Sequence, residues 1–335
     1  MKKQTSRFIL ISIFLLLICS LWTLVSGETS WGVVWNGVIQ RLSGTSNQWN
    51  PLLDERLPRL IILICTGASL AVSGAIMQSL FHNPLASPSV LGISTGGSLL
   101  VVVIFIFNWN LNHPYLLSIA AVSGCFLTLC LVYSIARIQD RFQMAQLILT
   151  GIALSTIFLS LQEVLLYSMR HQWQLIQTIT EWQAGSTINK NWQHVNMQLP
   201  LTLVGLLGAL LYRKELNLLA LGDEEAKNFG VDVERVRWHL FICVSLLTGG
   251  ALAAVGIIAF FGLVLPHIIR SLQGPDHRTL IPFCILGGAI VMMLLDILLR
   301  SFSIYSLSIG NISAIFGGIF FLILLFRTQT NRVFS

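Results

Sequence analysis

Residues 54–80 read DERLPRLIILICTGASLAVSGAIMQSL, and this stretch decides how the chain has to fold. Residues 61–80 carry no charge, and about 20 apolar residues are what a helix needs to cross the hydrocarbon core of a bilayer. Pro58 fits the first turn of such a helix, where a missing N–H group costs no hydrogen bond. The stretch therefore predicts a membrane-spanning helix that begins with Arg56 and Arg59 at its threshold.

The composition extends this prediction to the whole chain. The 335 residues are 55% hydrophobic and 10% charged, with a mean hydropathy of +0.78, whereas a soluble domain carries about 25% charged residues. We therefore expect an all-α polytopic membrane protein that forms one transmembrane domain over residues 1–335. The net charge of +6 requires no nucleic-acid partner, because most basic residues lie in short loops. The six cysteines all lie in apolar segments without a C-x-x-C pair, which favours buried thiols over disulfides or metal ligands.

Ten apolar segments are candidate spans. The first is interpreted as an uncleaved helix, because its apolar core is longer than that of a usual signal peptide. The seventh and eighth share one nearly continuous apolar run, so their division is an expectation that the structure has to test. The ten candidates are residues 8–27, 57–80, 92–108, 115–136, 143–167, 196–212, 236–256, 258–271, 279–299 and 309–326.

The basic residues predict the orientation of the chain. With the N-terminus inside, 14 of the 20 lysines and arginines fall on the cytoplasmic side, and such an excess marks cytoplasmic loops. Both termini are then cytoplasmic. The six on the outer side are Arg41, Arg56, Arg59, Arg170, Lys190 and Arg300.

Three of the outer arginines, Arg56, Arg59 and Arg300, run against this trend. Long basic side chains can simply reach lipid headgroups, or three of them on one face can dock an acidic partner. Asp296 stands four residues before Arg300 on the same predicted helix face, so we expect the two to pair. Glu163 is a second ionisable residue within a span and a candidate for the transport pathway.

The longest inner loop, residues 212–239, predicts a compact helical protrusion on the cytoplasmic face. Asp223 is expected to cap a short helix that Gly230 ends, and Asp232 to cap the next helix. The loop also carries apolar residues that would remain exposed unless a partner covers them. These are Leu218, Leu219, Leu221, Ala226, Phe229 and Val231.

An internal repeat relates the two halves of the chain. Positions offset by 182 residues are identical at eight places between residues 66 and 92. The second span would run inward and the seventh outward, so the halves are expected to be inverted repeats, a common transporter construction. The matched positions are Thr66, Gly67, Leu70, Ala71, Gly74, Ile76, Pro84 and Gly92 with Thr248, Gly249, Leu252, Ala253, Gly256, Ile258, Pro266 and Gly274.

The sequence contains no pattern of an enzyme active site. It has no nucleotide-binding G-x-x-x-x-G-K-[ST], no H-E-x-x-H and no G-x-S-x-G. We therefore expect neither catalytic residues nor a cofactor. His267 and His277 are too few to hold a metal. Asn83-Pro84 ends the second span, so Asn83 and Leu85 are candidates for lining a constriction there.

Four segments together resemble the permease subunits of iron–siderophore and cobalamin ABC importers, the FecCD/BtuC-like transmembrane subunits. The first two are residues 56–96, RLPRLIILICTGASLAVSGAIMQSLFHNPLASPSVLGISTG, and residues 256–282, GIIAFFGLVLPHIIRSLQGPDHRTLIP. The third segment is residues 181–192, EWQAGSTINKNW, which is similar to the Trp-x-x-Gly-Ser motif of these permeases. ALGDEEAKNFGV, residues 220–231, resembles their coupling loop, with Glu225 in place of the second alanine of the E-A-A-x-x-x-G pattern.

The resemblance implies roles for particular residues. Arg56, Arg59 and Arg300 match positions that meet glutamates of the substrate-binding protein, and Asn83 and Leu85 match cytoplasmic gate positions. The coupling loop would dock into the ATPase subunit through residues that match the family's coupling helices. The coupling residues are Leu221, Gly222, Asp223, Glu224, Glu225, Ala226 and Gly230.

The expected function is that of the transmembrane subunit of an ABC importer in a bacterial cytoplasmic (inner) membrane. It would carry a ferric siderophore, with an extracytoplasmic substrate-binding protein, cytoplasmic ABC ATPase subunits and a second permease subunit, identical or related, as partners. Cobalamin and haem remain alternative substrates. An ion-coupled secondary transporter is the alternative of a different class, although no coordinating group is evident near the middle of a span.

Overall fold

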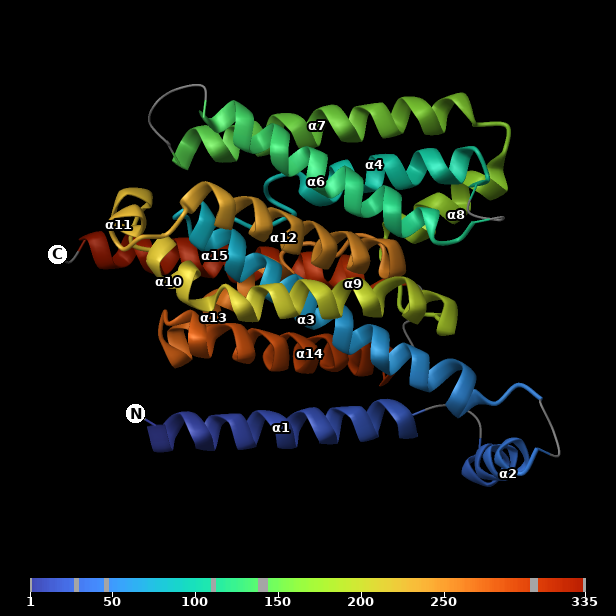
Figure 1. Ribbon diagram of the computed structural model, residues 1–335. Coiled ribbons are helices and arrows are strands. Elements are labelled where there is room, and N and C mark those ends of the chain that lie inside the picture. The colour runs from blue at the N-terminus through green and yellow to red at the C-terminus, as the bar shows by residue number, and fades with distance from the viewer. Residues whose placement is uncertain are drawn as a thin grey trace.

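The computed structural model describes residues 2–26, 30–44, 48–109, 113–137, 144–301 and 307–333. In these residues the fold is all-helical, with fourteen α-helices, one π-helical turn and no strand. The long helices run side by side, and both chain termini lie at the same end of the bundle (Figure 1).

The helices in chain order are α1 (Lys2–Val25), α2 (Trp31–Leu42), the π-helical turn η1 (Leu52–Arg56), α3 (Leu57–Leu80), α4 (Ile93–Ile106), α6 (Leu116–Arg137), α7 (Met144–Ser168), α8 (Trp173–Gln183), α9 (Trp192–Leu211), α10 (Arg213–Leu219), α11 (Asp223–Asn228), α12 (Val233–Val255), α13 (Phe261–Gln273), α14 (His277–Ser301) and α15 (Ile309–Val333).

Each of the ten predicted spans coincides with a helix, but not every helix is long enough to cross a bilayer. Seven described helices are, and α4 and residues 309–323 of α15 are shorter apolar stretches. The predicted eighth span, 258–271, is wrong in extent. Residues 256–260 are non-helical, and the 13 residues of α13 extend only about 20 Å, less than the hydrocarbon thickness of about 30 Å.

The helix predicted from the opening stretch, α3, lies at the centre of the bundle (Figure 1), and nearly all of its side chains are buried. Its backbone touches two other helices through glycines. A Cβ atom on Gly67 would lie 2.1 Å from the carbonyl oxygen of Gly288 in α14, and one on Gly74 would lie 1.7 Å from that of Gly262 in α13. Close approach of this kind replaces the hydrophobic drive between helices in lipid.

Buried hydrogen bonds tie α3 to α9 as well. The side-chain amide of Gln198 donates to Thr66 Oγ1 at 2.9 Å, and the hydroxyls of Ser69 and Thr202 lie 3.1 Å apart. All four residues are buried. Such polar contacts hold helices together where no water competes for the groups.

The predicted repeat fits α3 and α12 in part. The two helices run in opposite directions through the bundle, as an inverted repeat requires (Figure 1). Residues 66–73 and 248–255 are both helical. Beyond this point the halves differ, because Gly74 lies inside α3 whereas Gly256 follows the last residue of α12 with a φ of 91°.

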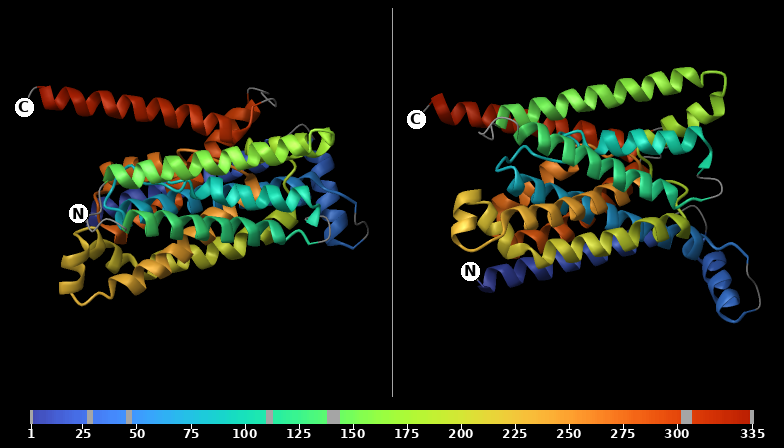
Figure 2. Two further views of the ribbon diagram at one scale, coloured as in Figure 1. Left: turned by 90° about the horizontal axis from the view of Figure 1, so that it is seen from above. Right: turned by 45° about the horizontal axis from the view of Figure 1, so that its top comes forward.

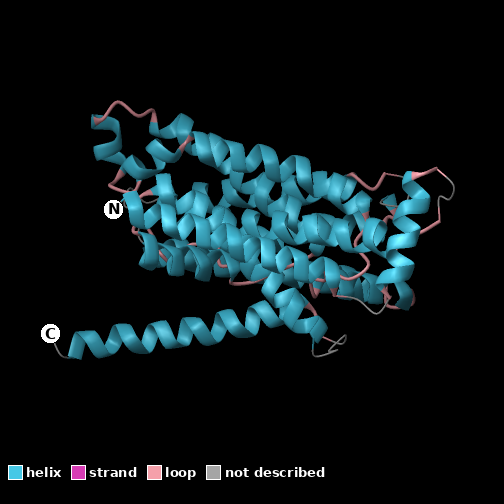
Figure 3. Ribbon diagram, turned by 90° about the horizontal axis from the view of Figure 1, so that it is seen from below, coloured by secondary structure: helices cyan, strands magenta, loops and turns pink. Residues whose placement is uncertain are grey.

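The edges of the bundle are formed by α1 and α15. Only 11% of the apolar window of α1 is buried. The C-terminal part of α15 extends away from the other helices (Figures 2 and 3). Exposed leucine, isoleucine and phenylalanine side chains cover both helices, as expected of surfaces that face lipid.

The glycine contact of α3 leads to a prediction about stability. Gly67→Ala should push α3 away from the backbone of Gly288 and lower the free energy of unfolding by about 2 kcal/mol or more. The control is Gly318→Ala in α15, where a Cβ atom meets nothing within 4 Å. Thermal unfolding of the purified protein in detergent measures both variants. Equal melting temperatures would show that the helices accommodate the extra methyl group.

Candidate functional site

The arginine cluster, defined as Arg56, Arg59 and Arg300 with Asp296, lies at the end of the bundle opposite the chain termini. Arg59 donates from Nε and Nη2 to Asp296 Oδ1, at 3.1 and 2.6 Å. The hydroxyl of Thr187 donates to the same oxygen at 2.7 Å. Because Arg59 is 8% exposed and Asp296 fully buried, the pair fixes α3 against α14.

This pairing corrects the prediction that Asp296 pairs with Arg300. The prediction considered only residues on one helix, and the guanidinium of Arg59 reaches the carboxylate from the neighbouring helix. Arg300 instead donates to two backbone carbonyls at the end of α1, from Nη2 to Ser26 at 2.6 Å and from Nη1 to Thr23 at 3.4 Å.

Arg56 holds the same helix end. Its Nη1 donates to the carbonyls of Leu24 and Val25 at 2.9 and 3.2 Å, and its guanidinium lies 5.8 Å from the ring centre of Trp31. The last carbonyls of a helix have no partner within it and carry a partial negative charge. Arg56 and Arg300 therefore act together as a cap on the C-terminus of α1.

The fold thus brings the three predicted docking arginines together, but their side chains are less exposed to solvent than the prediction of a docking surface implies. Arg56 is 3% and Arg59 8% exposed, and Arg300 is half-buried. The carbonyl groups of α1 are neutral, and the charges of Asp296 and nearby Glu55 do not balance three guanidinium groups. The cluster therefore keeps a net positive charge, and the field of such a charge favours acidic groups.

The Trp-x-x-Gly-Ser segment packs between the end of α12 and the start of α15. The N–H of Ser186 donates to the carbonyl of Val255 at 2.8 Å. Gly185 has a φ of 77°, and a Cβ atom on Gly310 would lie 2.3 Å from the carbonyl oxygen of Ala184. Gly310 has no role that its place in the sequence predicts, because only the fold brings it against this segment.

At the opposite end of the bundle, the 212–239 loop forms the predicted protrusion from α10 and α11 (Figure 1). Asp223 accepts two hydrogen bonds of 2.7 Å from Nη2 of Arg237 in α12. Nη1 of Arg237 donates to the hydroxyl of Tyr133 in α6 at 3.0 Å. The ion pair therefore joins α11 to α12, and the hydrogen bond from Arg237 to Tyr133 joins α12 to α6.

The predicted helix ends in this loop are right in two of three cases. Gly230 follows α11 with a φ of 82°, as a helix terminator should. The carboxylate of Asp232 accepts from the N–H of Arg235 at 3.1 Å and caps α12. The cap of α11 is wrong, because Gly222 occupies that position and the side chain of Asp223 turns to Arg237.

A second set of contacts ties the loop to α14 and α3. Asn217 Oδ1 lies 2.8 Å from both the N–H and Nδ1 of His277, and its Nδ2 donates to Asp276 at 2.7 Å. His277 Nε2 lies 2.6 Å from the hydroxyl of Ser79 at the end of α3. The N–H of Arg278 opposes the effect of burial and keeps the pKa of the Asp276 carboxyl below its usual value. These contacts therefore connect α10 to the ends of both spanning helices.

The surface of this loop presents apolar side chains, as predicted, although not all of those named. Leu221 is 63% and Phe229 is 68% exposed. Leu219 and Ala226 are buried and anchor the loop instead. Glu224 and Glu225 are exposed beside the apolar pair, so the surface combines apolar and acidic groups.

Asn83 and Leu85, the predicted gate residues, lie directly after α3 at the same end of the bundle. Asn83 is fully buried, and its Oδ1 accepts from the N–H of Leu85 at 2.8 Å. Its Nδ2 is buried without a partner in the described part of the chain. Leu85 is half-buried. The two form a tight turn where the helix ends, and their role as a gate stays a prediction.

Other ionisable residues named from the sequence do not join these groups. Glu163 lies on the exposed face of α7. His267 contacts the Phe320 ring edge to face, with 6.1 Å between the ring centres.

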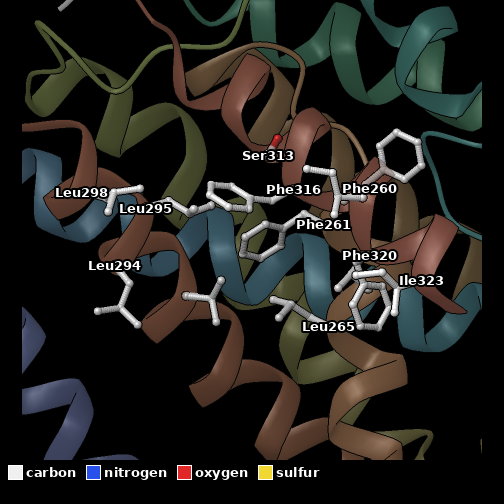
Figure 4. A pocket seen from close by; sticks show the side chains of 14 residues that line it. Phe260, Phe261, Leu265, Leu294, Leu295, Leu298, Ser313, Phe316, Phe320 and Ile323 are labelled. Carbon is white, nitrogen blue, oxygen red and sulfur yellow. The ribbon is translucent and has the colours of Figure 1, made fainter. Parts of the chain in front are cut away.

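An apolar cavity of about 500 Å³ lies between α13, α14 and α15. Its lining residues include Phe260, Phe261, Phe316 and Phe320 (Figure 4).

The ion pair of the loop leads to a second prediction. Asp223→Asn should weaken its hold on Arg237 and cost about 1–2 kcal/mol, because the carboxylate is partly exposed while the guanidinium is buried. Amide exchange over residues 220–232 should become about tenfold faster. Glu224→Gln, at an exposed carboxylate on the same helix, is the control and should exchange like the parent. If amide exchange in Asp223→Asn is unchanged, the ion pair does not anchor the loop.

Comparison with known proteins gives a family match over most of the chain. The model of the FecCD transport family matches residues 12–327. The hemin transport system permease protein HmuU of Yersinia pestis is 36% identical over 307 residues, which cover 90% of this chain and 90% of that protein. The vitamin B12 import system permease protein BtuC of Vibrio cholerae is 33% identical and covers 98% and 96%. The Fe(3+) dicitrate transport system permease protein FecD of Escherichia coli is 34% identical and covers 89% and 92%.

Solved structures show the same fold. A metal-chelate type ABC transporter in an inward-facing conformation superimposes with a TM-score of 0.79 at 29% identity, over 96% of this chain and 99% of that one.

Proposed function

The chain belongs to the FecCD transport family of ABC importer permeases, and from this premise we propose that it is the transmembrane subunit that carries a ferric siderophore across a bacterial cytoplasmic membrane. The observation that carries the proposal is the pair of sites at opposite ends of α3 and α14. One end holds the arginine cluster, and the other is tied to the 212–239 loop by His277 and Asn217.

A metal chelate is the substrate class that the relatives support. Their names give hemin, vitamin B12, ferric dicitrate and, for a Bacillus subtilis protein 33% identical to this chain, iron(3+)-hydroxamate. Three of these are chelates of iron, and the ferric siderophore is our proposal for that reason. Haem and cobalamin are the alternatives within the family.

The orientation follows from the basic residues. We place the 212–239 loop and both termini in the cytoplasm, because 14 of the 20 lysines and arginines then face inward. The arginine cluster then faces the outside, where a binding protein delivers the substrate. A helix such as α14, with 25 residues, extends about 37 Å and is long enough to join the two surfaces.

Docking of the binding protein is proposed to use the field of the arginine cluster. Carboxylates of that protein would approach Arg300, the most accessible of the three, and compete with the carbonyls of Ser26 and Thr23 for its donors. Charge complementarity of this kind raises association rates and fixes the register of the partners. Arg56 would respond through the same end of α1.

Transport is proposed to be driven through the 212–239 loop. A separate ATPase subunit would cover Leu221 and Phe229, which lie exposed beside Glu224 and Glu225. When the ATPase subunits close on ATP, α11 and α12 would move together, because Asp223 in α11 is bound to Arg237 in α12. The permease itself does no chemistry, and each state is stabilised only by contacts that differ between states.

The pathway is proposed to lie between this chain and a second permease subunit, identical or related. Movement of α10 would pull on the end of α3 through His277 and Ser79. Asn83 and Leu85 follow immediately in the chain, so a tilt of α3 would move both residues and open or close the cytoplasmic side.

Uptake by reconstituted vesicles tests the proposed function. Proteoliposomes that contain this chain, its ATPase and its binding protein should accumulate a ferric siderophore only with ATP, whereas collapsing the proton and sodium gradients should have no effect. Cobalamin and hemin are measured in parallel. Uptake that survives omission of the ATPase would favour an ion-coupled carrier, and uptake of one of the other two compounds alone would replace the siderophore.

Docking is tested separately by removing charge from the arginine cluster. Arg56→Gln with Arg300→Gln removes two charges, and gel filtration checks that the shorter side chains leave the fold intact. The affinity for the binding protein should fall by about tenfold, mainly through slower association. Arg170→Gln, at an exposed arginine that contacts Tyr167, is the control. Unaltered affinity of the double variant would rule out docking through the cluster.

A further inference from the structure

The short helix α2 has three different faces. Val34 and Val38 are buried against the protein. An apolar stripe, defined as Trp31, Trp35, Ile39 and Leu42, is exposed by 42, 57, 49 and 82%. A polar stripe of Gly32, Asn36, Gln40 and the C-cap residue Ser43 is exposed as well, with Val33, exposed by 63%, at its far edge. With 3.6 residues in each turn, the buried face, the apolar stripe and the polar stripe follow one another around the helix.

The position of α2 is fixed by its neighbours. The side chain of Asn50 donates to the carbonyl of Val34 at 3.0 Å, and Arg41 pairs with Asp54 in η1. Trp31 lies beneath Arg56, which caps α1. The buried face is therefore held against η1 and Asn50, and these contacts fix the direction of the apolar stripe.

The location of α2 relative to the bundle indicates what the apolar stripe contacts. It lies crosswise to α1, just beyond the end of that helix and at the edge of the bundle (Figures 1 and 2). The apolar window of α1 is 11% buried, so the adjoining surface of α1 faces lipid. A helix at the end of a lipid-facing span and across its axis lies at the level of the headgroups.

We propose that α2 lies in the headgroup layer of the leaflet at the arginine end, with its apolar stripe in the lipid and its polar stripe in water. Tryptophan favours this interface, and an amphipathic helix buries its apolar face at the boundary between headgroups and acyl chains. The partner of the apolar stripe is lipid, and the contact is apolar. Arg41 does not contribute a free charge to it, because Arg41 is paired with Asp54. Through Trp31 and Arg56, this contact would hold the cap on α1 in place.

Quenching in nanodiscs tests the proposal. Trp35→Cys and Ile39→Cys in the apolar stripe are compared with Asn36→Cys and Gln40→Cys in the polar stripe, with Cys130, the half-buried native thiol, replaced by alanine. Each position is labelled with a small fluorophore, and gel filtration confirms folding. Brominated acyl chains should quench positions 35 and 39 at least about threefold more than 36 and 40, and aqueous iodide should show the reverse order.

Two outcomes would overturn the inference. Equal quenching at all four positions by both agents would mean that α2 has no fixed place at the interface. Strong iodide quenching at 35 and 39 without quenching by brominated lipid would mean that the apolar stripe faces water, as a docking surface for a protein would. The quenching experiment uses neither substrate nor ATPase. Its failure can therefore be distinguished from a failure of the proposed function.

Discussion

Backbone contact between α3 and α14 is the constraint on which the rest of the structure depends. In lipid there is no hydrophobic drive between apolar helices, so they associate by close packing and by the hydrogen bonds that close packing permits. Gly67 and Gly288 allow the two backbones to touch. Only at that separation do Arg59 and Asp296 meet at one end of the helix pair, and Ser79 and His277 at the other.

The other charged groups of these sites lie near the two ends of the bundle. At one surface the guanidinium groups of Arg56 and Arg300 hold the end of α1 and leave a net positive field. At the other, Asp223 and Arg237 join the 212–239 loop to α12. Both ends are connected to the same helices, and the proposed transport mechanism depends on this connection, because alternating access in transporters uses movements of packed helices.

The errors in the sequence-based predictions have a common physical cause. Asp296 was assigned to Arg300, and Asp223 to a helix cap, because both assignments considered neighbours along the chain. In each case an arginine from another helix, Arg59 or Arg237, reaches the carboxylate. For Asp223 the bond to Arg237 is charge-assisted and about twice as strong as the bond to a neutral N–H group that a helix cap would make. The extent of α13 was missed because Gly256 and the non-helical residues after it are as apolar as a span.

The sequence by itself determined the membrane class, the approximate positions of the helical segments and the protruding loop, because hydrophobic length and the positions of glycine and proline are local properties of the chain. Its motifs indicated the family. Only the tertiary structure decided which arginine pairs with Asp296, which groups cap α1, and that α2 presents separate faces to protein, lipid and water. These depend on distances between residues far apart in the chain, such as Arg59 and Asp296, and a pattern along one helix contains no information about what packs against it.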